Sequence, residues 1–316
     1  GGIAFFPCIT VTVSLAIIGY NLWQGYNILD MDLTNRLLSM LCCLFILYLI
    51  GMMDDLIGVR YRSKFVVQIL CGILLVISGL CFDNLYGLFG IYVIPYYIGV
   101  PFTVFVIVYI LNAINLIDGI DGLASGLSII AFLAFGCMFI RLQWWMYAFI
   151  SLAAFGVLLP FFYYNVYGKI HRGRKIFMGD TGSLTIGMLL AVMAIRLSMS
   201  DPMKESVFPG VIVTAFSFLI VPMLDVVRVV LHRWRNRKPL FLPDKNHIHH
   251  KFIALGMSQR KAMACIIALA LAFAVVNVFL IHYLTTTTLF LLDVAVWTVL
   301  HCYITIKIKR KNNCTE

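Results

Sequence analysis

The chain has 316 residues, of which 62% are hydrophobic and 12% are charged, with a formal net charge of +10 and a mean hydropathy of +0.97. This composition leaves too little polar surface for a water-soluble globular protein, so we expect an all-α fold, a polytopic bundle of transmembrane helices. The positive charge is explained by membrane topology and by affinity for anionic lipid and anionic substrate, so no nucleic acid is expected as a partner.

Apolar segments recur along the whole chain. A membrane-spanning helix needs roughly 20 mainly apolar residues. About ten segments approach this length, and we expect a span at each of 3–20, 37–53, 65–82, 98–116, 123–140, 144–164, 183–200, 208–230, 262–283 and 288–306. No repeat, low-complexity tract or linker divides the chain, which predicts one integral membrane domain over residues 1–316.

Basic residues predict the orientation, because Lys and Arg in short loops are retained in the cytoplasm. If residue 1 lies inside, and Arg228 is counted at the inner end of its helix, twenty of the 24 Lys and Arg residues fall inside. The inner segments are then 54–64, 117–122, 165–182, 231–261 and 307–316. The four basic residues outside this set are Arg36, Arg141, Arg196 and Lys204.

Acidic residues gather on the same predicted side. Of the 14 Asp and Glu residues, seven map there: Asp54, Asp55, Asp118, Asp121, Asp180, Asp225 and Asp244. Carboxylates that converge beside so many cations predict a site for a ligand that is both anionic and metal-bound.

The first polar cluster is the pair Asp54 and Asp55 at the inner end of the second expected span, followed by Lys64. Adjacent carboxylates repel each other, which indicates that a cation or a proton relay lies between them. The alternative is a solvated helix end with extended basic side chains.

The second cluster follows the fourth expected span. Asn112, Asn115 and Asp118 are three residues apart and therefore share one side of the last helical turns, and Asp121 follows within a glycine-containing turn. Ligands that are all oxygen atoms suit Mg²⁺ or Mn²⁺. The alternative is an Asn- and Asp-rich turn that caps the next helix.

The third cluster, at 177–183, contains Asp180 directly before the seventh expected span. Asp180 could be a simple helix cap, or the small residues around it could form a phosphate cradle at a helix N-terminus.

The fourth cluster is His247, His249 and His250, within the basic cytoplasmic loop expected over 231–261. We expect these side chains to bind an anion. A zinc site and a solvated basic loop are the alternatives.

These four clusters, in this order, resemble the polyprenyl-phosphate N-acetylhexosamine-1-phosphate transferase family of the glycosyltransferase 4 type. The resemblance runs from residue 1 to about residue 261. The spacing of His247, His249 and His250 resembles the WecA/TagO-like branch. The branch that makes peptidoglycan lipid I, phospho-N-acetylmuramoyl-pentapeptide transferase, has three contiguous histidines and is the alternative. Gly1 and Gly2 resemble the end of a family segment, which implies a further span upstream of residue 1.

The resemblance implies a reaction and its partners. N-acetylglucosamine 1-phosphate, or a related N-acetylhexosamine 1-phosphate, would pass from a UDP-N-acetylhexosamine to undecaprenyl phosphate. UMP would be released, and cell-surface polysaccharide synthesis would be initiated. The enzyme would be a multi-pass protein of the bacterial inner membrane, surrounded by lipid, with its active site on the cytoplasmic face. The family also allows a homodimer.

The resemblance also implies roles for the clustered residues. Asp121 and Asp180 would hold Mg²⁺, for which Mn²⁺ could substitute, with Asp118 nearby as a catalytic residue. Asp54 and Asp55 would deprotonate or orient the acceptor phosphate. Substrate contacts would come from Lys64, Asn112, Asn115, His247, His249 and His250. Asn165 lies further from Asp180 than the corresponding family Asn does, so no nucleotide-binding role is transferred to it.

Two other classes of protein fit the sequence less well. A cation-coupled transporter would place its acidic residues near the bilayer midplane in two related halves, whereas these acids lie at the ends of spans. A receptor or scaffold with a basic lipid-binding loop would leave the paired carboxylates without a purpose.

Overall fold

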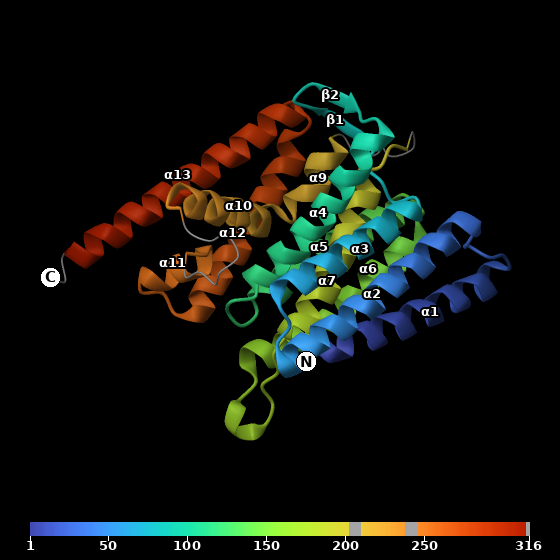
Figure 1. Ribbon diagram of the computed structural model, residues 1–316, viewed down its shortest axis with the longest axis horizontal. Helices are drawn as coiled ribbons and strands as arrows, with labels where there is room; N and C mark the ends of the chain where they lie inside the picture. The colour runs from blue at the N-terminus through green and yellow to red at the C-terminus, as the bar shows by residue number, and fades with distance from the viewer. Residues whose placement is uncertain (202–209, 238–245, 314–316) are drawn as a thin grey trace.

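The computed structural model describes residues 1–201, 210–237 and 246–313. Asp244 and Lys204, which the sequence assigned to opposite sides of the membrane, lie outside these residues. The chain folds into a bundle of long helices with a short β-hairpin at one end (Figure 1). The first part of the bundle contains α1 (Phe5–Gln24), α2 (Met31–Ile57), α3 (Tyr61–Ile77), α4 (Tyr96–Ile117), α5 (Leu123–Arg141), α6 (Trp145–Tyr167) and α7 (Gly179–Ser198). The second part contains α9 (Val211–Ser217), α10 (Ile220–Arg235), α11 (Ile248–Ala254), α12 (Gln259–Leu280) and α13 (Thr286–Asn313).

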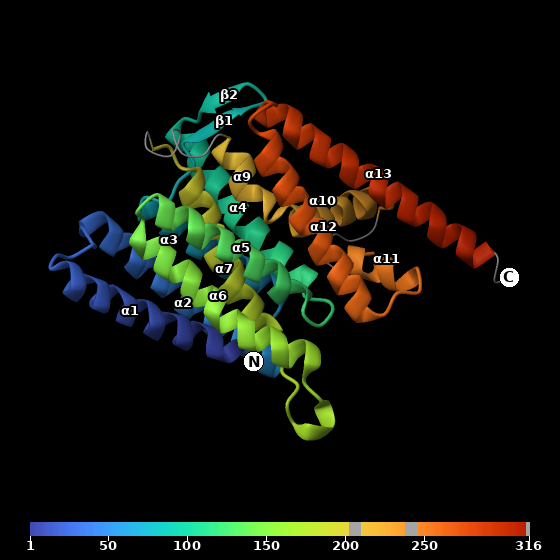
Figure 2. The same ribbon diagram turned by 180° about the vertical axis from the view of Figure 1, so that it is seen from behind.

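Helix α7 forms the centre of the bundle. An 18-residue stretch of α7 is 94% buried, whereas the corresponding stretches of α1, α2 and α13 are each 28% buried. The helices α2 and α4 pack against α7, and α5 and α6 pack against each other on the far side, as the reverse view shows (Figure 2). The outer helices carry many exposed apolar side chains, such as Leu15 and Leu22, which suit contact with lipid.

The described residues support a multi-pass membrane protein, although the predicted number of ten spans is not confirmed. Eight helices are long and apolar enough to cross a membrane. One further pair, α9 and α10, meets the same criteria as a unit but is bent by 80°. The predicted span at 65–82 corresponds to α3, which has only 17 residues. It ends early because the chain turns at Gly79, where φ is +88°.

Two further local features differ from the expectation. The residues between α3 and α4 form an antiparallel hairpin of β1 (Asn84–Leu88) and β2 (Ile91–Val93), which was not predicted from the sequence. The segment 231–261 is not a continuous loop, because α10 extends to Arg235, α11 occupies Ile248–Ala254 and α12 begins at Gln259.

The start of α7 is tightly enclosed. A Cβ atom on Gly51 of α2 would lie only 2.6 Å from Cα of Thr181, so the two backbones touch there without an intervening side chain. A Cβ atom on Gly2 would lie 2.6 Å from Cα of Gly182. Since Gly51 is one helical turn before Asp54, this contact brings the acidic end of α2 to the first turn of α7.

We expect Gly51→Ala to lower the melting temperature of the purified protein. The added methyl group would force α2 and α7 apart, at a cost on the order of 1–3 kcal/mol. Gly19→Ala in α1 is the matched control, because nothing lies within 4 Å of a Cβ atom there and alanine favours a helix. Equal melting temperatures for Gly51→Ala and the unmodified protein would contradict the close packing.

Candidate active site

Lys64 connects the acidic end of α2 with the start of α7. Its Nζ lies 2.8 Å from Oδ2 of Asp54 and 2.5 Å from Oδ2 of Asp180. The other Asp54 oxygen accepts a hydrogen bond from the backbone N–H of Val59 at 2.6 Å. All three charged side chains are between 17% and 25% exposed, so water screens these ion pairs less than it would on an open surface.

Asp55 caps the N-terminus of α7. Its Oδ1 accepts a hydrogen bond from the backbone N–H of Asp180 at 2.8 Å. Its Oδ2 accepts from the N–H of Thr181 at 3.1 Å and from the Thr181 hydroxyl at 2.5 Å. These N–H groups have no partner within their own helix, and a negative charge is favourable at a helix N-terminus. Asp55 therefore supports α7, and its predicted action on an acceptor remains a prediction.

The two asparagines of α4 contact different neighbours. Asn112 donates from Nδ2 to Oε1 of Gln68 in α3 at 2.7 Å. Asn115 donates to Oδ1 of Asp180 at 3.1 Å and to the Ser183 hydroxyl at 2.8 Å. Only Asn115 therefore touches the acidic cluster directly, whereas Asn112 joins α4 to α3.

The turn between α4 and α5 adds two more carboxylates. Burial, followed by the negative charges of Asp121 and Asp180, raises the pKa of Asp118 to about 7. Asp121 forms an ion pair with Lys175, with Nζ 2.5 Å from Oδ2. Asp118, Asp121 and Asp180 thus lie close enough to repel one another, which makes this end of the bundle favourable for a cation.

Asn165 fixes the position of that turn. Its Oδ1 accepts a hydrogen bond from the N–H of Gly122 at 2.6 Å, and its Nδ2 donates to the carbonyl oxygen of Ile176 at 2.8 Å. One buried carboxamide at the end of α6 therefore ties the α4–α5 turn to the segment that precedes α7. The sequence did not indicate this structural role.

The histidines are held by a buried carboxylate in α10. Asp225 accepts hydrogen bonds from Nδ1 of His247 at 2.8 Å and from the backbone N–H of Ile248 at 3.1 Å. Arg228 donates to Asp225 at 2.8 Å. Asp225 is completely buried, so these donors are what makes its burial tolerable.

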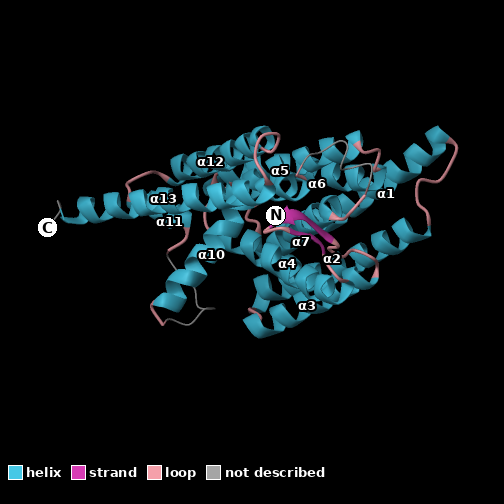
Figure 3. Cartoon of the chain, turned by 90° about the horizontal axis from the view of Figure 1, so that it is seen from above, coloured by secondary structure: helices cyan, strands magenta, loops and turns pink. Residues whose placement is uncertain are grey.

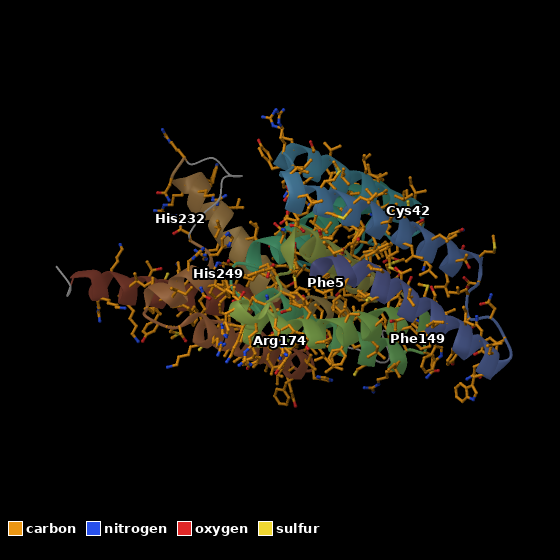
Figure 4. All side chains as sticks on the ribbon, turned by 90° about the horizontal axis from the view of Figure 1, so that it is seen from below. Phe5, Cys42, Phe149, Arg174, His232 and His249 are labelled. Atoms are coloured by element: carbon orange, nitrogen blue, oxygen red, sulfur yellow. The ribbon has the colours of Figure 1, made fainter. Side chains whose placement is uncertain are left out.

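His249 lies against the α4–α5 turn. A Cβ atom on Gly119 would lie 2.2 Å from Nε2 of His249, and no side chain larger than hydrogen would leave room for the ring. The rings of His247 and His249 are parallel at 5.9 Å, and the His250 ring is 4.2 Å from that of His249. Burial, with the nearby His250 and His247, lowers the pKa of His249 to about 4. Seen from below (Figure 4), His249 lies nearer the bundle than His232 of α10, and Cys42 and Phe149 lie toward the α1–α2 connection.

The structure brings most of the predicted residues to one end of the bundle. Lys64, Asn115 and Asp180 are in direct contact, and Asp118 and Asp121 interact with them electrostatically. The histidines reach the same end through Gly119. The functions predicted for these residues remain predictions.

A divalent cation suits the chemistry of this site, although its ligands are not preassembled. Within residues 1–201, 210–237 and 246–313, no three His, Cys, Asp or Glu side chains form a metal-binding group. The carboxylates instead face Lys64 and Lys175. Oxygen donors with mutually repelling charges are the ligands that Mg²⁺ prefers, so the predicted magnesium site remains a prediction.

Two residues of the cluster had no predicted function. Lys175 belongs to the inner segment 165–182, and its pairing with Asp121 depends on how that segment folds back. Asp225 was predicted to lie on the same side as the other acidic residues, without a role. An acidic residue inside an apolar run, Val221 to Val230, is a signal that could have indicated a buried partner.

We expect the stability of the folded protein to depend on His249 between pH 4 and pH 6.5. The pKa of His249 is about 4 in the folded protein and about 6.5 when unfolded, so the unfolded chain binds the proton more readily in this range. Stability should therefore fall as the pH decreases from 6.5 to 4, and this fall should be smaller in His249→Gln. The melting temperatures of both proteins across this pH range provide the measurement. Parallel curves would show that His249 is not buried in its neutral form.

Known proteins share these sequence features. The sequence profile of glycosyl transferase family 4 matches residues 37–198, just over half of the chain. The chain is 30% identical over 240 residues to a probable undecaprenyl-phosphate N-acetylglucosaminyl 1-phosphate transferase of Bacillus subtilis (strain 168), covering 73% of this chain and 62% of the relative.

Two further relatives are similar to the same extent. Identity is 33% over 239 residues to a decaprenyl-phosphate N-acetylglucosaminephosphotransferase of Mycobacterium tuberculosis (strain CDC 1551 / Oshkosh), covering 69% of this chain and 57% of that protein. Identity is 31% over 247 residues to an undecaprenyl-phosphate alpha-N-acetylglucosaminyl 1-phosphate transferase of Escherichia coli (strain K12), covering 75% of this chain and 64% of that protein. The matched region is less than two thirds of the length of each of these relatives.

Proposed function

The chain belongs to glycosyl transferase family 4, and we propose that it transfers N-acetylglucosamine 1-phosphate from UDP-N-acetylglucosamine to undecaprenyl phosphate. The relatives' names supply the substrate class. The observation that carries the proposal is the bridge of Lys64 between Asp54 and Asp180, with Asp118 and Asp121 beside it at one end of a membrane bundle. This end would face the cytoplasm of a bacterial inner membrane, since most basic residues lie in the loops on this side.

The reaction would join two anionic substrates. An oxygen of the lipid phosphate attacks the β-phosphorus of the UDP-sugar, the bond between the β-phosphorus and the bridging oxygen breaks, and UMP leaves with that oxygen. Phosphoryl transfer of this kind depends on positioning and on neutralising charge more than on covalent catalysis. Lys64 and Lys175 carry the charge needed to orient phosphate oxygens.

The protein's residues divide into two groups around the reacting phosphates. Asp54, held by Lys64 and by the backbone of Val59, would orient the acceptor phosphate or remove its proton, and Asp55 would keep α7 in place. Asn112 and Asn115 would order the donor side of the site. The three histidines, of which His249 packs against the α4–α5 turn, would contact phosphate oxygens.

Mg²⁺, or Mn²⁺, would be held by Asp121 and Asp180, with Asp118 nearby. When bound, the ion would neutralise the diphosphate and the departing UMP.

A long apolar groove offers a place for the acceptor's hydrocarbon chain. It has a volume of about 1040 Å³ and lies between α4, α9, α10 and α13. Its apolar wall includes Phe102, Phe105, Phe216, Phe290 and Trp297. Basic residues line it as well, among them Arg228, Arg235 and Lys251. Because Arg228 is bonded to Asp225, which holds His247, this basic part of the groove lies beside the histidine cluster.

A direct assay tests this function. Membranes that contain the protein are incubated with Mg²⁺, undecaprenyl phosphate and radiolabelled UDP-N-acetylglucosamine, UDP-N-acetylgalactosamine or UDP-glucose. We expect an organic-extractable labelled lipid and an equal amount of UMP with UDP-N-acetylglucosamine. No labelled lipid with either UDP-N-acetylhexosamine would refute the proposal. Gel filtration of the detergent-solubilised protein would test for a dimer.

We expect Asp180→Asn to reduce kcat on the order of 10²-fold or more. The amide cannot supply the charge that pairs with Lys64 or that would hold a divalent cation. Asp83→Asn is the matched control, because Asp83 bonds to Ser200 away from the acidic cluster. Near-normal turnover by a folded Asp180→Asn protein would remove Asp180 from the active site.

Lys175→Met should raise the KM for the UDP-sugar by about tenfold, which corresponds to one lost charge-assisted contact. Lys169→Met removes the same charge from an exposed position in the same segment and should leave KM unchanged. If the two variants shifted KM equally, the effect would come from the general charge of the segment and not from the Lys175–Asp121 pair.

A further inference from the structure

A second polar cavity lies at the opposite end of the bundle from the carboxylates. It has a volume of about 260 Å³ and is lined by the start of α2, the α5–α6 connection and the end of α7. Arg36 is 18 residues from Asp54, which corresponds to about 27 Å along α2. This separation is close to the roughly 30 Å thickness of the hydrocarbon core, so the cavity lies at the level of the headgroups of the other leaflet.

Two arginines line this cavity with an incomplete set of hydrogen bonds. The buried Nε atoms of Arg36 and Arg196 have no hydrogen-bond partner. Within the residues that the structure describes, Arg36 forms no hydrogen bond or ion pair at all. The two guanidinium groups are also close enough to repel each other electrostatically. Asp201 and Tyr147 attract Arg196 electrostatically, but its buried Nε–H has no acceptor, and neither has that of Arg36. Buried charged donors without acceptors are costly, which points to a ligand with several anionic oxygen atoms.

Aromatic rings fix the arginine arrangement. The guanidinium of Arg196 lies 3.7 Å from the ring centroid of Trp144 and 5.5 Å from that of Tyr147. Stacking holds the plane of the guanidinium but accepts no N–H hydrogen bond in that plane. Trp145 also lines the cavity, and tryptophans are enriched where membrane meets water.

Two carboxylates add negative charge to the cavity. Asp30 and Asp32 line it together with the arginines. Asp30 accepts a hydrogen bond from the N–H of Leu33 at 2.7 Å and therefore caps α2. Asp32 is exposed. A purely anionic ligand would be opposed by these two carboxylates, whereas a ligand that also carries an ammonium group would pair with both signs of charge.

We infer that this cavity binds the headgroup of an ammonium-bearing, zwitterionic phospholipid from the leaflet opposite the candidate active site. The phosphodiester lies between the two arginines and the ammonium group faces the two aspartates. The bifurcated donors of arginine match phosphate oxygens, and a cavity of about 260 Å³ is suited to a headgroup and not to the long chain of a polyprenol.

Native mass spectrometry of the purified full chain tests this site, with phosphatidylethanolamine and phosphatidylglycerol of identical acyl chains as probes. We expect the protein to bind phosphatidylethanolamine more tightly. Arg36→Gln should weaken that binding by about tenfold, the effect of one lost charge-assisted contact. Arg141→Gln, an exposed arginine outside the cavity, is the matched control and should bind like the unmodified protein.

Three results would overturn the inference. They are equal binding of both lipids, unchanged binding by Arg36→Gln, and displacement of the lipid by inorganic phosphate, which would indicate a soluble anion. If Arg36→Gln does not fold, Asp32→Asn decides, because this exposed substitution should remove the preference for phosphatidylethanolamine over phosphatidylglycerol. An unchanged preference in Asp32→Asn would also reject the site.

Discussion

The first turn of α7 is the element on which the candidate active site depends. It meets α2 backbone to backbone at Gly51, and its free N–H groups are satisfied by Asp55. Because these contacts fix the helix end from two sides, the Asp180 side chain is directed toward Lys64 and Asn115. The position of this one helical turn therefore determines where several charged groups from distant parts of the chain meet.

The rest of the site is organised by charge compensation. Each carboxylate that would be unfavourable alone has a cation or a row of N–H groups beside it: Asp54 and Asp180 share Lys64, Asp121 has Lys175, and Asp225 has Arg228. Asp118 is the exception, because burial and the charges of Asp121 and Asp180 raise its pKa and no cation among the described residues offsets them. If a divalent cation paired with these carboxylates, Lys64 and Lys175 would become available to anionic oxygen atoms of a substrate.

Much of this could be predicted from the sequence, because membrane topology restricts where polar residues go. Once the spans and their orientation are assigned, Asp54, Asp118 and Asp180 must lie on one side, and the fold brings them together. The individual partners could not be predicted. The pairing of Lys175 with Asp121 and the clamp formed by Asn165 depend on how two loops fold over each other.

Short helices and strands could not be predicted from sequence patterns either. The strands β1 and β2 have five and three residues, and α11 has seven, too few to establish a periodicity. The hairpin further depends on a left-handed backbone conformation at Tyr86 and Phe89, and neither residue type indicates such a turn in a sequence. Its attachment through Thr286 and Thr287 of α13 joins positions about 200 residues apart.

The sharp bend between α9 and α10 has a consequence for how the protein can be entered. A straight helix would have closed the wall of the bundle, but the 80° change of direction sends α10 outward (Figure 3). The apolar groove between α4, α9, α10 and α13 lies beside this bend. A hydrocarbon chain bound there would be able to enter from within the lipid, whereas a water-soluble ligand of the charged end would approach from the aqueous side, so that the two would use separate entrances.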